Sequence, residues 1–225
     1  MIPFTLLDTA NWAATTLRLY QRGEEFSIRV DKAGELMNSR AHHSEEVLAQ
    51  LACAQIDGRE NPYLLVGGLG MGFTLAAVLA HTRPDAHVVV SELIPAVVRW
   101  NRDYMGALAG FPLNDGRVEV QEKDVALVMQ AHNKRYDAIM LDVDNGPGSF
   151  TRDDNDALYS APGLLRAYDA LKSGGVLTVW SACEDAAFTE RMRRTGFTVT
   201  QHRAGSHQAK RGNRHVIWMG VKLNN

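Results

Sequence analysis

Apolar runs and helical patterns alternate along the chain from Tyr63 onward. The apolar runs that predict buried strands cover residues 63–67, 87–92, 117–122, 137–142 and 175–180. The helical patterns between these runs lie near residues 73–82, 95–105, 124–132 and 160–171. Such alternation is typical of a parallel sheet covered by helices on both faces.

Two further strand patterns follow, at residues 197–202 and 214–222. Only the segment AGSHQAKRGN lies between them, which is too short for a crossover helix. These two strands are therefore expected to form an antiparallel hairpin. The prediction is an α/β fold with five parallel strands and a terminal antiparallel hairpin.

The N-terminal part follows a different pattern. Residues 17–38 alternate apolar and polar around RGEE and DKAG, which predicts two or three short antiparallel strands. The next segment, SEEVLAQLACAQI, has a helical pattern, with Ser44 as a candidate N-cap and Glu45 and Glu46 near the positive helix start. We therefore divide the chain into a short β extension over residues 1–43 and a larger domain over residues 44–225.

Composition narrows the class of protein. The net charge of −2 gives no general attraction to nucleic acid or to an anionic membrane. The N-terminus lacks a signal-peptide pattern, and no window reaches the roughly 18 apolar residues of a spanning helix. Cys53 and Cys183 stand in apolar contexts without metal-ligand spacing. We expect free buried thiols in a cytoplasmic protein and no metal site.

The segment LLVGGLGMGFTL places Gly68, Gly70 and Gly72 directly after a predicted strand. The dinucleotide fingerprint would require glycine at position 73, where this chain has Phe73. A tight turn without a ligand explains the same glycines, so this motif alone does not decide between the two.

Two carboxylates at later strand ends change this interpretation. Glu92 ends the second predicted strand, where a carboxylate can accept both hydroxyls of a ribose. Asp124 follows the third, where it could accept from an adenine amino group or cap the next helix. Open α/β sheets bind ligands at successive carboxyl ends of their strands. Together these residues predict a site for an adenosine-type nucleoside.

Asp142 ends the apolar strand AIML and precedes a Gly-Pro turn. Asp142 and Asp144 lie within three residues, and a partly desolvated pocket would raise the pKa of at least one of them. Such a carboxylate can hold a protonated amine and accept its proton as the nitrogen attacks an electrophilic carbon. The alternative is that Asp144 and Asn145 only form the turn beside Gly146.

Five segments follow in order along the chain, within a resemblance that covers about residues 36–222: LLVGGLGMGFTL, VVVSELIPAVVRWNR, RVEVQEKDVA, YDAIMLDVDNGPG and LYSAPGLLRAYDALKSGGVLTVWS. In order and spacing they resemble the motifs of spermidine synthases and their relatives. The resemblance implies the class I S-adenosylmethionine-dependent methyltransferase fold. It also implies an S-adenosyl donor, a small-molecule amine acceptor and a homodimer.

The resemblance further implies roles for particular residues. The sulfonium nucleoside would be bound by Gly68, Gly70, Met71, Gly72, Glu92, Leu93, Asp124 and Val125. The catalytic carboxylates would be Asp142 and Asp144. The amine would be bound by Glu46, Asn145, Pro147 and Tyr159. Independently of the resemblance, the polar and acidic loop 146–160, bounded by glycines, is either a lid over the amine or a solvated loop.

The chain departs from that family at three places. Where the family's glycine loop carries an aspartate that pairs with the donor's aminopropyl ammonium, this chain has Met71. The turn after Asp142 reads VDNGP, so its second carboxylate is displaced. The tyrosine and histidine expected before Glu46 are replaced by Ser44 and Glu45. Apart from these three places, the resemblance implies that the family's N-terminal β-domain is shortened here to about one hairpin.

We therefore expect a transferase that uses S-adenosylmethionine or decarboxylated S-adenosylmethionine on a small amine. Met71 favours methyl transfer, because a buried ammonium without a counter-charge loses binding energy. The motif series favours aminopropyl transfer instead, and we place methyl transfer slightly ahead. A nucleoside-binding paralogue without turnover is a further alternative.

The basic residues near the C-terminus could contact RNA phosphates. They are His202, Arg203, His207, Lys210, Arg211, Arg214 and His215. No aromatic side chains are interleaved among them, so we assign them to a solvated hairpin tip and do not expect nucleic acid as a partner.

Overall fold

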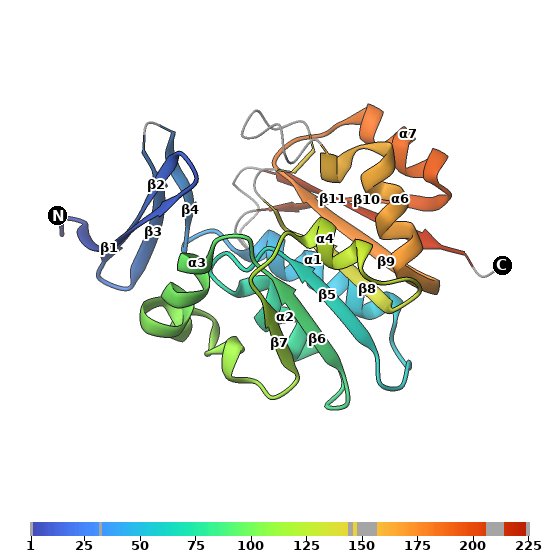
Figure 1. Cartoon of the computed structure of the whole chain (residues 1–225), viewed down its shortest axis with the longest axis horizontal. Helices are drawn as coiled ribbons and strands as arrows, with labels where there is room; N and C mark the ends of the chain where they lie inside the picture. Colours follow the sequence, from blue (N-terminus) through green and yellow to red (C-terminus); the bar gives the residue numbers. More distant parts are fainter. Residues whose placement is uncertain (1, 32, 144–145, 148–156, 206–213, 224–225) are drawn as a thin grey trace.

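The computed structural model describes residues 2–31, 33–143, 146–147, 157–205 and 214–223 (Figure 1). Seven strands form the main sheet, in the order β10-β11-β9-β8-β5-β6-β7. They are β5 (Tyr63–Gly67), β6 (His87–Ser91), β7 (Val118–Gln121), β8 (Tyr136–Leu141), β9 (Leu171–Ser181), β10 (Phe197–Gly205) and β11 (Arg214–Lys222). Strands β5 to β9 pair in parallel, and β11 pairs antiparallel with both β9 and β10. The predicted α/β fold with a terminal antiparallel hairpin is confirmed.

Helices cover both faces of this sheet (Figure 1). The helices are α1 (His43–Gln55), α2 (Phe73–His81), α3 (Pro95–Trp100), α4 (Val125–Gln130), α6 (Ala161–Ala170) and α7 (Ala186–Thr195). Leu64 and Val66 of β5 join the core formed with α1, α2 and α3, whereas Leu65 joins the core formed with α4, α6 and α7. This alternation explains why β5 is apolar throughout, since both of its faces are buried.

Two short helical segments follow α3 without a break, η1 (Asn101–Met105) and η2 (Gly106–Ala109), and a third, η3 (Pro112–Asn114), begins after Gly110 and Phe111. The first of them has π-helical hydrogen bonding. The continuous helix expected over residues 95–105 is therefore an α-helix for its first half only. Asn101, the first residue after α3, is buried and donates to the backbone of the glycine turn.

The N-terminal extension is larger than the single hairpin expected from the sequence. Its strands β1 (Thr5–Trp12), β2 (Thr15–Arg22), β3 (Glu25–Val30) and β4 (Gly34–Asn38) form an antiparallel sheet in chain order. The sequence did not indicate β1 because its side chains are exposed or half-buried and give no clear alternation. Figure 1 shows this small sheet beside α3 at one end of the molecule.

Asp8 of β1 links the small sheet to α3. Its Oδ2 accepts hydrogen bonds from Trp100 Nε1 at 2.7 Å and from Arg99 at 2.8 Å. These two bonds hold the pKa of Asp8 below its usual range. Leu17 and Leu19 of β2 also pack into the same core as α1 and α2, so the extension shares its core with the larger domain.

Three further predictions about local structure were wrong. Helix α7 was not expected, because its apolar face is short. Its N-cap is Asp185, whose side chain accepts a hydrogen bond from Phe188 N at 3.0 Å. Ser44 is not the N-cap of α1, which is His42. Cys53 is buried as expected, but Cys183 is exposed. Within the described residues, no helix is long and apolar enough to cross a membrane.

Candidate functional site

The glycine turn after β5 is shaped first by a close approach of backbone. Gly68 has φ +90°, and a Cβ on it would lie 2.2 Å from the backbone oxygen of Asp142. Asp142 N donates to Gly67 O at 2.8 Å, which holds the end of β8 against the end of β5. Glycine at position 68 therefore allows Asp142 to lie directly beside the turn.

Two side chains from neighbouring elements hold the rest of the turn. Glu92, which is 8% exposed, accepts from Leu69 N through Oε2 and from Ile94 N through Oε1, both at 2.9 Å. Asn101 donates from Nδ2 to Gly70 O at 2.8 Å. Sequence reasoning missed Asn101, because its contact with Gly70 forms only in the folded chain, between residues 31 positions apart. Both side chains therefore hold the backbone of the turn in place.

A cavity of about 250 Å³ lies between the glycine turn, α1, β4 and the ends of β8, β9 and β11. The residues that give it chemical character are Glu45, Met71, Thr74, Asp142, Trp180 and His215. Gly70 lies on its wall, as does Met37 of the small sheet. The cavity thus joins residues that are distant in sequence at the carboxyl ends of the strands, where open α/β sheets bind ligands.

Asp142 is the carboxylate at the centre of this arrangement. Thr74, at the start of α2, donates from Oγ1 to Asp142 Oδ2 at 2.5 Å. Burial raises the pKa of Asp142 to about 6, against the opposing effect of the Thr74 hydrogen bond. At neutral pH the carboxylate is mostly ionised and able to accept a proton, as a general base requires.

Glu45 is a second carboxylate in the same cavity, and the sequence assigned it only to the start of a helix. Ser44 Oγ donates to Glu45 Oε2 at 2.7 Å. Burial, followed by the charge of Asp142, raises the pKa of Glu45 to about 7. The two acids therefore interact through the cavity, and one of them is partly protonated near neutral pH.

His215 was expected at a solvated hairpin tip, but it lies on the cavity wall. Its Nδ1 is 2.9 Å from Ser44 Oγ, and its ring packs against Trp180 with 4.7 Å between centroids. Burial lowers the pKa of His215, so the ring is neutral at physiological pH. Only tertiary structure could reveal this role, because Ser44 and His215 are 171 residues apart.

The other predicted nucleoside-binding residues lie along the same edge of the sheet. Gly72 is the left-handed N-cap of α2, and Met71 is 4% exposed and lines the cavity. Leu93 is exposed. Asp124 caps α4 by accepting from Ala126 N at 2.7 Å, and the buried Val125 begins that helix. The capping alternative for Asp124 is confirmed, and its contact with adenine stays a prediction.

The described residues that were predicted to bind the amine, Glu46, Pro147 and Tyr159, do not line the cavity. Glu46 points to His42 and His43, with ion-pair distances of 2.9 and 3.3 Å, and does not line the cavity. The buried Tyr159 donates from its hydroxyl to Val143 O at 3.2 Å. Pro147 is buried beside Ser181, whose hydroxyl donates to its oxygen. Asp144, Asn145 and most of the loop 146–160 lie outside the described residues.

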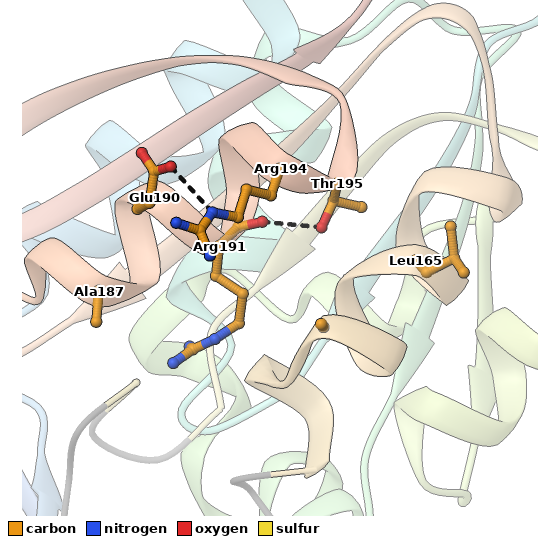
Figure 2. Close-up of a pocket in the computed structure, with 7 residues that line it drawn as sticks. Leu165, Ala187, Glu190, Arg191, Arg194 and Thr195 are labelled. Carbon is orange, nitrogen blue, oxygen red and sulfur yellow. Dashed lines mark hydrogen bonds and ion pairs between the residues drawn. The ribbon is translucent and has the colours of Figure 1, made fainter.

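A larger hollow, of about 660 Å³, lies between α6 and α7 and has no residue in common with this cavity. Figure 2 shows Leu165 on one side and Glu190, Arg191 and Arg194 on the other. Glu190 pairs with Arg194 at 3.1 Å, and Arg191 donates to Tyr159 O at 3.0 Å. With its charged groups already paired, the hollow offers no chemistry comparable to that of the two carboxylates.

Comparisons with known proteins agree on one family. A family model described as "Spermine/spermidine synthase domain" matches residues 42–195. A polyamine aminopropyltransferase from Thermoanaerobacter pseudethanolicus is 32% identical over 118 residues, which cover 51% of this chain and 38% of that protein. The spermidine synthase of Schizosaccharomyces pombe is 28% identical over 142 residues, which cover 62% of this chain and 44% of that protein. The matched regions thus span less than half of these relatives' length.

Solved structures show the same fold. The spermidine synthase from Thermotoga maritima superposes with a TM-score of 0.77 at 16% identity, covering 98% of this chain and 74% of that one. A spermidine synthase in complex with the transition state analogue AdoDATO superposes with a TM-score of 0.75 at 15% identity. The superposition covers 98% of this chain and 73% of that one. At this identity the likeness establishes the fold, including the N-terminal sheet.

Proposed function

Because the chain belongs to the spermine/spermidine synthase domain family, we propose that it transfers an aminopropyl group from decarboxylated S-adenosylmethionine to a small amine. One observation carries this proposal: Asp142 lies beside the glycine turn in a cavity, with its pKa raised to about 6. A carboxylate in that state can bind an ammonium and then accept its proton.

The sequence analysis favoured methyl transfer slightly over aminopropyl transfer. The comparisons with known proteins favour aminopropyl transfer. A matched relative is named as a polyamine aminopropyltransferase and another as a spermidine synthase. The argument for methyl transfer was the missing counter-charge at Met71. That argument is weaker in the folded protein, because Met71 and the Glu45 carboxylate line the same cavity.

The reaction requires little activation of the donor. The donor supplies a carbon made electrophilic by its bond to a positive sulfur. The amine nitrogen forms a bond to that carbon, and the carbon–sulfur bond breaks with its electron pair going to sulfur, which leaves 5′-methylthioadenosine. The proton lost from the amine goes to Asp142, and the rest of the catalysis is alignment of nitrogen, carbon and sulfur.

Each part of the site has a task in this proposal. The glycine turn, fixed by Glu92 and Asn101, would position the nucleoside. Thr74 donates to Oδ2 of Asp142, which orients the carboxylate so that Oδ1 can face the amine. Glu92 and Asp124 would bind ribose and adenine, since a carboxylate oxygen can accept more than one hydrogen bond. The homodimer and the cytoplasmic location stay predictions.

The proposal can be tested by identifying products. The purified protein is incubated with decarboxylated S-adenosylmethionine or S-adenosylmethionine and a panel of diamines and monoamines, and the products are analysed by mass spectrometry. We expect an aminopropylated amine and 5′-methylthioadenosine with the decarboxylated donor only. A methylated amine and S-adenosylhomocysteine would instead establish methyl transfer. Nucleoside binding without any product would establish a paralogue that does not turn over.

A further inference from the structure

The cavity beside the glycine turn has two acidic side chains, and no described lysine or arginine lines it to balance their charge. The two acids are Glu45 and Asp142. His215 also lines the cavity, and burial lowers the pKa of its ring, which keeps it neutral at physiological pH. Two carboxylates that face the same cavity without a cation repel each other, which destabilises the ligand-free state. A positively charged ligand would remove that repulsion.

The rest of the lining indicates what kind of cation fits. Within the described residues no group of three or more histidine, cysteine, aspartate or glutamate side chains could hold a metal ion. Met37, Met71, Phe73 and Trp180 give the cavity thioether and aromatic walls. Such walls suit methylene groups, and an aromatic face also attracts an organic cation. An alkyl chain that ends in a primary ammonium matches both parts of the lining.

Glu45 is held in place for such a contact by residues outside the glycine turn. Ser44 Oγ donates to Glu45 Oε2 at 2.7 Å, and His215 Nδ1 lies 2.9 Å from the same Ser44 oxygen. Because the serine proton is engaged with the carboxylate, the histidine nitrogen is the donor to the serine. The two hydrogen bonds, from His215 to Ser44 and from Ser44 to Glu45, therefore hold one carboxylate oxygen of Glu45 in place.

We propose that Glu45 and Asp142 together bind one primary ammonium group, and that Glu45 makes the site select charged ligands over neutral ones. This inference rests on the proposed function, which supplies two ammonium groups: that of the donor's aminopropyl arm and that of the amine acceptor. Glu45 supplies the counter-charge that the glycine turn lacks at Met71. The ammonium offers three N–H donors, enough to bond both carboxylates at once.

The test uses two pairs of ligands that differ only in the ammonium. The first pair is 5′-deoxy-5′-(3-aminopropylthio)adenosine and 5′-deoxy-5′-(propylthio)adenosine, and the second is 1,4-diaminobutane and 1-aminobutane. Calorimetry gives the affinity of each ligand for the native protein, for Glu45→Gln and for Glu190→Gln. Glu190 is the control, because it is an exposed glutamate that pairs with Arg194 on α7 and does not line this cavity (Figure 2). Binding of the uncharged propylthio nucleoside reports whether each variant is folded.

We expect the native protein to prefer the aminopropyl nucleoside, and Glu45→Gln to reduce that preference about tenfold, the scale of one charge-assisted hydrogen bond. Glu190→Gln should leave it unchanged. If Glu45→Gln reduces only the preference for 1,4-diaminobutane over 1-aminobutane, the ammonium that Glu45 and Asp142 bind is that of the acceptor. This outcome also supports the proposed site. If the nucleosides bind and Glu45→Gln changes neither preference, the inference is wrong. If the native protein binds neither nucleoside, the proposed function is wrong and this inference is wrong with it.

The pH dependence gives a second readout. Glu45 is faced by Asp142 from the end of β8, by Glu46 on its own helix, and by Ser44, which His215 of β11 contacts. An ammonium needs the carboxylates ionised, so the native preference should increase between about pH 6 and pH 8. Glu45→Gln should flatten that increase. A preference that does not change with pH in the native protein would contradict the carboxylate pair.

Discussion

Replacing Gly68 by alanine tests the contact that places Asp142. The left-handed backbone of Gly68, at φ +90°, costs an alanine about 1 kcal/mol. The new Cβ would lie 2.2 Å from Asp142 O, far inside contact distance, so the end of β8 must move. Overpacking of this kind costs about 1–3 kcal/mol more. We therefore expect Gly68→Ala to lower the free energy of unfolding by about 2–4 kcal/mol in total.

Gly110→Ala separates the two contributions. Gly110 also has a positive φ, +71°, but nothing lies within 4 Å of a Cβ built on it. Only the backbone cost of about 1 kcal/mol applies there. Urea titration gives both free energies, and for a chain of this length the melting temperatures should fall by roughly 5–15 °C for Gly68→Ala and roughly 2–4 °C for Gly110→Ala. Equal losses for the two variants would refute the close contact between Gly68 and Asp142.

Three further variants test the site. Asp142→Asn should lower turnover about 10²-fold or more, because the amide cannot accept the proton, while calorimetry should show nearly unchanged binding of 5′-deoxy-5′-(propylthio)adenosine, which has no ammonium; unchanged turnover would make Asp142 structural. Thr74→Val removes the hydrogen bond that lowers the pKa of Asp142, so the acidic limb of the pH–rate profile should move to higher pH, and a move to lower pH would contradict the assignment. Glu92→Ala should abolish most of the increase in melting temperature caused by the donor, and NAD should cause no increase in the native protein; a full shift in the variant would remove Glu92 from the nucleoside site.

The titration of Glu45 also has a consequence for stability. Its pKa is raised from 4.5 to about 7 on folding, so the folded state binds more protons than the unfolded state between these values. Stability must therefore fall as pH rises through that window. Glu45→Gln should raise the melting temperature at about pH 8 and have little effect at about pH 5. Differential scanning calorimetry measures both, and a variant less stable at pH 8 would contradict the repulsion with Asp142.

The sequence predicted best where periodicity reflects burial. The five parallel strands were found because each is apolar on one or both faces, and Asp142 was found because it interrupts such a run at its carboxyl end. The strand β1 was missed because its side chains are exposed or half-buried, and α7 because its buried face consists of only three residues. Local patterns report burial, and these two elements have little of it.

The cavity itself was predicted only in part, for a different physical reason. Met71 and Asp142 belong to motifs that can be read along the chain, whereas Glu45 and His215 acquire their role from contacts across the fold. From the sequence, Glu45 was assigned only to the start of a helix, and His215 to a solvated hairpin tip. The sequence analysis assigned Glu46, and not Glu45, to the amine site. In the structure, Glu46 lies one position further along α1 and pairs with His42 and His43. Which side of a helix faces a site is set by tertiary packing.

The position of β11 in the sheet sets an order for events during synthesis. It is the last of the described strands in sequence, yet it lies between β9 and β10. While the ribosome is still making residues 214–222, the edge of β9 over Val176–Ser181 has no partner, and β10 has no strand to join. An uncovered apolar edge invites pairing with other chains. A nascent chain that stops before β11 should therefore aggregate, and it also lacks His215, so the cavity is completed only when this strand inserts.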